Sequence, residues 1–110
     1  MIVQKYLENK DQVMALVLEK LEYYNTFYNF KYNRVSIKNQ KTKWGSCSSL
    51  GNLNFNYKLL HLPQRLFDYV IVHELCHLGQ MNHSKDFWQL VEKTFPDYEV
   101  LRTELKKVRL

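Results

Sequence analysis

The sequence predicts a single α+β domain over residues 1–110, with an N-terminal helix, a small antiparallel sheet of about three strands, a buried helix and C-terminal helices. Three observations predict this class. Apolar residues recur at helical spacing near the N-terminus, period-two alternation replaces that spacing in the middle, and a strongly apolar helical pattern follows Pro63. A chain of 110 residues fits one compact domain and is too short for two.

Residues 1–28 are predicted to form one or two helices. Their apolar face consists of residues spaced mostly three or four apart: Met14, Val17, Leu18, Leu21 and Tyr24. Charged residues are mixed into the segment, so it lacks the pattern of a signal peptide. No apolar run is long enough to span a bilayer, and we expect no membrane partner.

Alternation with period two predicts strands in the middle of the chain. Arg34–Lys38 and Asn52–Asn56 both alternate, and residues 42–44 lead into a third short segment, Gly45-Ser46-Cys47. A turn is expected at residues 48–51, where serine and glycine gather. A glycine inside a strand, here Gly45, indicates a bulge or a close approach by another backbone.

Helices are predicted in the last third of the sequence. Pro63 is suited to open the first of them, because its missing N–H costs nothing in the first turn, and Gly79 is suited to end it. Ser84 has the side chain of an N-cap for the next helix. The Pro96-Asp97 pair breaks that helix, and a last helix is expected at about residues 98–107.

The clearest chemical signal is the pentapeptide His73-Glu74-Leu75-Cys76-His77 in the apolar helix. Residues four apart lie on one helical face, so the imidazoles of His73 and His77 can converge on one ion. Glu74 is rotated by roughly 100° from His73 and can reach a metal-bound water instead of the metal. The H-E-x-x-H motif of zinc peptidases works in this way: two histidines bind the metal and the glutamate acts on its water.

A third histidine, His83, lies ten residues after His73. On a continuous helix the two would be about 15 Å apart along the axis, too far to share an ion. The chain is therefore predicted to break after His77 and double back, and Gly79 supplies a break at the right place.

Two alternatives compete with a catalytic metal site. An H-E-x-x-H can occur by chance on a buried helix, but ionisable side chains on an apolar helix are costly without a purpose. A structural zinc site would have four protein ligands rich in cysteine. Cys76 is expected to pack as a small apolar residue, and a structural site gives Glu74 no role.

The motifs resemble the YgjP-like metallopeptidase family of zincins. The resemblance rests on residues 72–78 (VHELCHL) with 81–84 (MNHS), and on an upstream segment at 43–48 (KWGSCS). It covers residues 34 to 105 and is less clear before them. It implies a zincin-like α+β fold, zinc as cofactor and His83 as the third ligand.

The implied activity is hydrolysis of peptide bonds by a zinc-activated water, with Glu74 as general base. In zincins an edge strand beside the metal binds extended substrate, which assigns substrate binding to Trp44, Gly45 and Ser46. Alternatively, Trp44 fills the core and Gly45 marks a bulge. An alternative is a catalytically weak or inactive zincin-like domain that binds zinc and a peptide or another partner.

Other assignments stay open in the sequence. Gluzincins take a downstream glutamate as third ligand, a role open to Glu92 and Glu99, although His83 is preferred. The oxyanion-stabilising donor has four candidates: Tyr57, His61, Tyr98 and Arg102.

The charge pattern and cysteine content bear on partners and location. The net charge is +5, but the basic residues are scattered, so nucleic acid is not expected as a partner. A peptide or unfolded protein is the expected substrate, and an exposed substrate-binding edge allows self-association. The only cysteines, Cys47 and Cys76, are too few for a disulfide framework, which with the absent signal peptide favours the cytoplasm.

Overall fold

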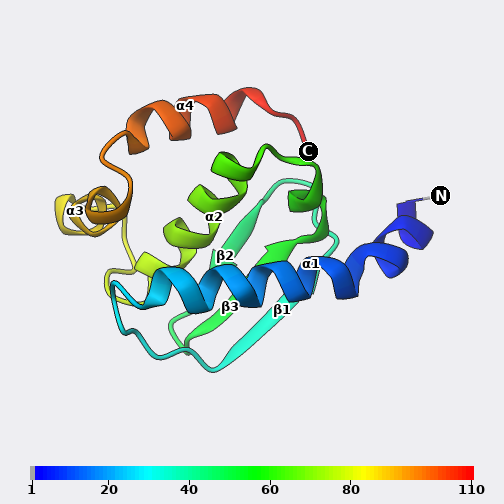
Figure 1. Ribbon diagram of the computed structural model, residues 1–110, viewed down its shortest axis with the longest axis horizontal. Helices are drawn as coiled ribbons and strands as arrows, with labels where there is room; N and C mark the ends of the chain where they lie inside the picture. The colour runs from blue at the N-terminus through cyan, green and yellow to red at the C-terminus, as the bar shows by residue number, and fades with distance from the viewer. Residues whose placement is uncertain (1) are drawn as a thin grey trace.

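The structure is a computed structural model that describes the backbone of residues 2–110 and the side chains from residue 5 onward. In chain order the elements are α1 Ile2–Asn25, β1 Arg34–Lys38, β2 Gly45–Cys47, β3 Asn52–Asn56, the 3-10 helix η1 Tyr57–His61, α2 Gln64–Cys76, α3 Lys85–Thr94 and α4 Tyr98–Lys107. Helix α1 packs over β1, α2 packs over β2, and α3 and α4 flank α2 (Figure 1). No helix in the described range is long and apolar enough to cross a membrane.

The sheet is mixed, in the order β1-β3-β2. β2 and β3 form an antiparallel hairpin, whereas β1 pairs with β3 in parallel. The predicted antiparallel pairing therefore holds for one pair of neighbours and is wrong for the other. Residues 39–44 carry the chain from β1 past the end of β3 to the opposite edge, so that β1 and β3 point the same way. Alternation reports which side chains face the core, not which strand is the neighbour.

The core lies between the sheet and the first two helices. Leu53 and Phe55 of β3 are fully buried and belong to one core cluster with residues of α1 and α2. α1 contributes a narrow stripe spaced four residues apart, at Val13, Val17 and Leu21, all fully buried. Leu18, predicted to share this face, is 43% exposed, because the helix contacts its neighbours along one seam only.

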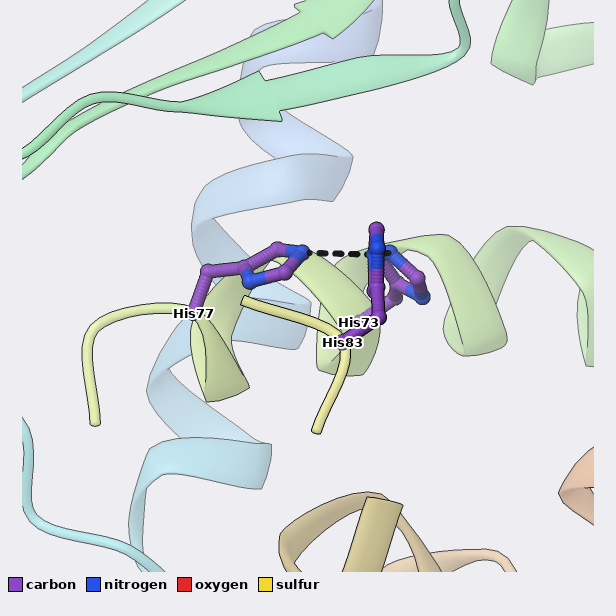
Figure 2. A group of neighbouring side chains, drawn as sticks. All are labelled: His73, His77 and His83. Carbon is purple, nitrogen blue, oxygen red and sulfur yellow. Dashed lines mark hydrogen bonds between the residues drawn. The ribbon is translucent and has the colours of Figure 1, made fainter. Parts of the chain in front are cut away.

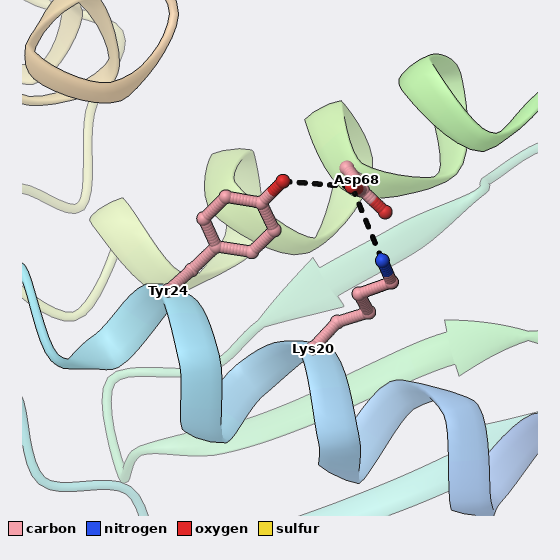
Figure 3. Close-up of polar contacts among 3 residues, drawn as sticks. All are labelled: Lys20, Tyr24 and Asp68. Carbon is pink, nitrogen blue, oxygen red and sulfur yellow. Dashed lines mark hydrogen bonds and ion pairs between the residues drawn. The ribbon is translucent and has the colours of Figure 1, made fainter.

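A polar contact ties α1 to α2 within this otherwise apolar interface. Asp68 of α2 is 7% exposed, and its Oδ2 accepts a hydrogen bond of 2.7 Å from the Tyr24 hydroxyl. Lys20 Nζ lies 3.4 Å from the same oxygen (Figure 3). Burial, and then the hydrogen bond to Asp68, raise the pKa of Tyr24, so the phenol stays protonated and donates. The contact satisfies the Oδ2 atom of a buried carboxylate, whose Oδ1 has no hydrogen-bond partner, and it ties α2 to α1.

Replacing Tyr24 with phenylalanine should destabilise the protein. The substitution leaves the ring in place but removes one of the two partners of Asp68 Oδ2, and we expect the free energy of unfolding to fall by about 1–2 kcal/mol. Tyr23→Phe is the matched control, because Tyr23 is 57% exposed and precedes Tyr24 on the same helix. Urea unfolding of the two variants measures the difference. Equal stabilities would show that the hydroxyl contact contributes nothing.

A buried asparagine shapes the loop that leads into β2. Asn56 is fully buried, and its Nδ2 donates to the carbonyl oxygens of Gln40 at 2.7 Å and Lys43 at 2.9 Å. Its backbone N–H donates to the carbonyl oxygen of Trp44 at 2.8 Å. These bonds hold the loop against the end of β3, and so they place Trp44 and Gly45 beside α2.

Candidate metal centre

Three histidine side chains converge at the C-terminal end of α2. His73 lies in the last turn, His77 is the residue that caps the helix, and His83 lies in the following loop. The Nε2 atom of His83 lies 3.2 Å from Nε2 of His77 and 3.2 Å from Nε2 of His73 (Figure 2). The ligand atoms of all three residues lie within 4.8 Å of one another. The sequence prediction that these three residues come together is therefore met.

The chain reaches His83 by leaving the helix directly after the second histidine. Turn hydrogen bonds run from His77 N to Glu74 O at 3.2 Å and from Gly79 N to Cys76 O at 3.0 Å. A Cβ on Gly79 would lie 2.7 Å from Cζ of Phe30, so a larger residue here would collide with that ring. The predicted break is present, and the absence of a side chain at Gly79 leaves room for the ring of Phe30.

The spacing of the nitrogens fits a metal ion. Two nitrogens bound to a tetrahedral zinc ion at about 2.0–2.1 Å would lie about 3.3 Å apart, close to the observed separations. His77 Nδ1 donates to the carbonyl oxygen of Gln80 at 3.0 Å, which leaves the lone pair of Nε2 free to face the centre. The Tyr69 hydroxyl lies 3.4 Å from Nδ1 of His73. Such partners on the outer nitrogen are typical of metal-bound histidines.

Burial favours the neutral form of His73 and of His77. It lowers the pKa of His73 to about 3, with smaller contributions from the neighbouring His77 and His83. The pKa of His77 is lowered by burial as well. A neutral imidazole offers a lone pair to a cation, whereas a protonated one repels it, so the environment favours the form that binds metal.

Helix α3 supplies an aromatic wall behind the histidines. Phe87 stacks on His77, with ring centroids 4.3 Å apart and planes inclined by 19°. Trp88 stacks on His83 at 5.7 Å and 22°. These contacts restrict the rings of His77 and His83. Trp88 therefore supports His83, although His83 lies in an exposed loop.

Glu74 lies between the histidines and the sheet edge. It is 7% exposed, and burial raises its pKa to about 8, opposed by the positive charge of Lys43. A Cβ on Gly45 would lie 3.0 Å from Glu74 Cγ and 3.3 Å from its Oε2. A Cβ on Gly45 would also lie 3.0 Å from the backbone oxygen of Asn54, and the β2–β3 register is continuous, so a close approach by another backbone is present at Gly45 and a bulge is not.

A cavity of about 240 Å³ opens beside His73 and Glu74. Its floor is α2, one wall is the segment leading into β2, and the other wall is α4. Trp44 and Gly45 line it. Ser46, the third residue predicted to bind substrate, is directed elsewhere, because its Oγ lies 3.3 Å from Nδ2 of Asn54 on β3.

Other candidate residues lie outside the metal centre. Within the described residues, the group that could hold a metal ion includes neither Glu92 nor Glu99, so the glutamate alternative for the third ligand is not supported. Tyr57 is buried against the ring of Tyr6, and His61 does not line the cavity. Cys76 is fully buried in the core, as predicted.

Two supporting groups escaped the sequence analysis. The Tyr69 hydroxyl lies four residues before His73, a spacing that could have identified it as a partner. The backbone carbonyl of Gln80 carries no such signal, because any residue at that position supplies it.

Of the proposed oxyanion donors, Arg102 lines the cavity, whereas Tyr98 stacks on Trp88 at 5.0 Å.

Comparisons with known proteins agree with this geometry. The metallopeptidase zymogen abylysin of Pyrococcus abyssi superposes with a TM-score of 0.73 and 28% identity, over 84% of this chain and 96% of that one. The metallopeptidase zymogen jannalysin of Methanocaldococcus jannaschii gives a TM-score of 0.67 and 25% identity, over 82% and 91%. None of the curated proteins matches the chain. The family model "YgjP-like, metallopeptidase domain" matches residues 3–108, and this protein therefore belongs to the YgjP-like metallopeptidase family.

Proposed function

We propose that the protein is a zinc-dependent peptidase that cleaves peptides or unfolded proteins. The observation that carries the proposal is the convergence of three imidazoles next to a buried carboxylate: His83 Nε2 lies 3.2 Å from Nε2 of both His73 and His77. His73, His77 and His83 would hold the ion, and the ion would supply a Lewis acid that polarises the scissile carbonyl and acidifies water. Imidazole nitrogens at this spacing suit zinc, and the metal-ligand group found among the described residues consists of these three histidines without a cysteine.

Glu74 carries the proton in this proposal. It accepts a proton from the water that attacks the carbonyl carbon, and it returns that proton to the amine as the carbon–nitrogen bond breaks. A pKa raised by burial to about 8 suits a group that both takes up and releases a proton near neutral pH. The packing of Glu74 against Gly45 limits the positions of the carboxylate, which favours a fixed reaction geometry.

The edge strand β2 would bind the substrate backbone. β2 is at the edge of the sheet beside α2, so one side of its backbone has no strand partner. An extended peptide can pair there by adding a strand, and Trp44 with Gly45 lines the adjoining cavity. Ser46 would contribute through its backbone only, since its hydroxyl faces Asn54. The free thiols of Cys47 and Cys76 are in keeping with the cytoplasmic location we propose.

Hydrolysis of a reduced, denatured protein tests the proposal. We expect the zinc-loaded chain to cleave it, a chelator to stop cleavage and added zinc to restore it. Because both structural relatives are described as zymogens, a chain ending at Lys107 belongs in the same assay. The cut follows the last residue of α4 and removes Val108, Arg109 and Leu110, which line a cavity with Trp44.

The outcomes separate the two candidate functions. Cleavage by either chain that depends on zinc supports the peptidase. Zinc and peptide binding without cleavage by either chain would refute it, and would favour the alternative of an inactive zinc-binding domain.

A further inference from the structure

We propose that the cavity beside the metal centre binds a carboxylate of the substrate, with Arg102 as the residue that recognises it. The proposal rests on the peptidase function and adds a substrate class to it. The carboxylate can belong to an acidic side chain or to the C-terminus of a peptide, and both present the same planar group.

The charge of the cavity is strongly one-sided. Three cations line it, Lys43 on the β2 side and Arg102 and Lys106 on α4, against the single carboxylate of Glu74. All three cations are exposed, whereas Glu74 is buried. A bound divalent ion would add further positive charge at the floor. An anionic group is therefore attracted into this cavity, and a cationic one is repelled.

Arg102 is held in position while its donors stay available. Its guanidinium lies 5.0 Å from the centroid of the Trp88 ring, in a cation–π contact. Trp88 lies 5.8 Å from the ring of His73, so the guanidinium is supported close to the metal centre. Among the described residues no carboxylate lies within ion-pair distance of Arg102, and its N–H groups have no hydrogen-bond acceptor.

The chemistry of that arrangement fits a carboxylate best. The planar fork of an arginine matches the two oxygens of a carboxylate, and stacking on an aromatic face leaves the edge of the fork free. The remainder of the lining includes apolar groups from Trp44, Val70 and Leu105, which suit the carbon atoms next to the carboxylate. A substrate with a carboxylate near the scissile bond would thus satisfy both parts of the cavity.

Binding of short peptides tests this without depending on cleavage. The probes are acetyl-Ala-Ala-Glu-Ala-Ala-amide, the same peptide with Gln for Glu, and the Gln peptide with a free C-terminal carboxylate. They are titrated against the zinc-loaded full chain carrying Glu74→Gln, which prevents turnover. Intrinsic fluorescence is the readout, because the chain has two tryptophans and these are Trp44 and Trp88, both at the cavity or its support.

We expect at least one carboxylate peptide to bind about five- to tenfold more tightly than the neutral peptide, since exposed ion pairs are modest in water. Adding Arg102→Gln should reduce that ratio to about one, and rising salt should reduce it as well. Arg34→Gln is the matched control, because it removes the same charge from the exposed start of β1. The peptide that shows the preference identifies the source of the carboxylate.

Several results would overturn the proposal. Equal binding of the three peptides would do so. A preference that survives Arg102→Gln would place the carboxylate elsewhere, for example on the metal. Tight, Arg102-dependent binding of an oligothymidine without any peptide preference would assign the cations to nucleic acid. Cleavage of denatured protein without a peptide preference would leave the peptidase standing and remove this subsite. A preference for a carboxylate peptide without any cleavage of denatured protein would keep this subsite and refute the peptidase function.

Discussion

The variant His83→Ala should lose its bound zinc. His83 Nε2 lies 3.2 Å from both other ligand nitrogens, so its removal leaves two imidazoles four residues apart on one helix. Loss of a supporting partner alone typically weakens a metal site by about 10–100-fold, and we expect the loss of a ligand to cost at least about 100-fold. Metal content after extensive dialysis measures this, with one zinc per chain expected in the wild type.

The fourth histidine provides the control. His61 lies on η1, is exposed and does not line the cavity, so His61→Ala should keep its zinc. A second readout is the thermal midpoint, because a ligand that binds only the folded state raises it. Added zinc should raise the midpoint of wild type and His61→Ala, and much less that of His83→Ala. Full zinc content in His83→Ala would refute the three-histidine site.

The elements could be predicted from the sequence because each carries a local signal. β1 and β3 have the bounds that alternation indicated, and α4 runs from Tyr98 to Lys107 as the Pro96-Asp97 break suggested. Strand pairing has no local signal, which is why the parallel β1–β3 pair was missed. The same holds for Leu18, whose exposure depends on how far the neighbours of α1 extend.

The convergence of the three histidines could be predicted for a similar reason. The spacing of His73 and His77 fixes their geometry on a helix, and only a bend can bring His83 to them. The cavity depends instead on the packing of α4 against α2. That packing places Arg102 over the ring of Trp88 and makes Lys106 line the same cavity as His73. Those contacts arise from tertiary structure. The sequence offered Arg102 as one candidate donor among four and gave no reason to choose it.

The variant Glu74→Gln should abolish most hydrolysis while keeping the metal. Glutamine has nearly the same shape and fits the space beside Gly45, but it cannot accept the proton of the attacking water. Loss of a general base typically costs about 10²–10⁴-fold, and we expect a fall in kcat of this size with little change in KM. The measurement is steady-state cleavage of a peptide found in the denatured-protein assay, with zinc content determined on the same samples.

Glu92→Gln is the appropriate control for this variant. Glu92 is an exposed glutamate on α3, and it was one of the two sequence candidates for a glutamate ligand. Its replacement should change neither cleavage nor zinc content. The contrast between the two variants separates proton transfer from simple loss of negative charge, because each removes one carboxylate from the same small domain. Retention of full activity by Glu74→Gln would mean that another group takes the proton, even though the three histidines hold the metal.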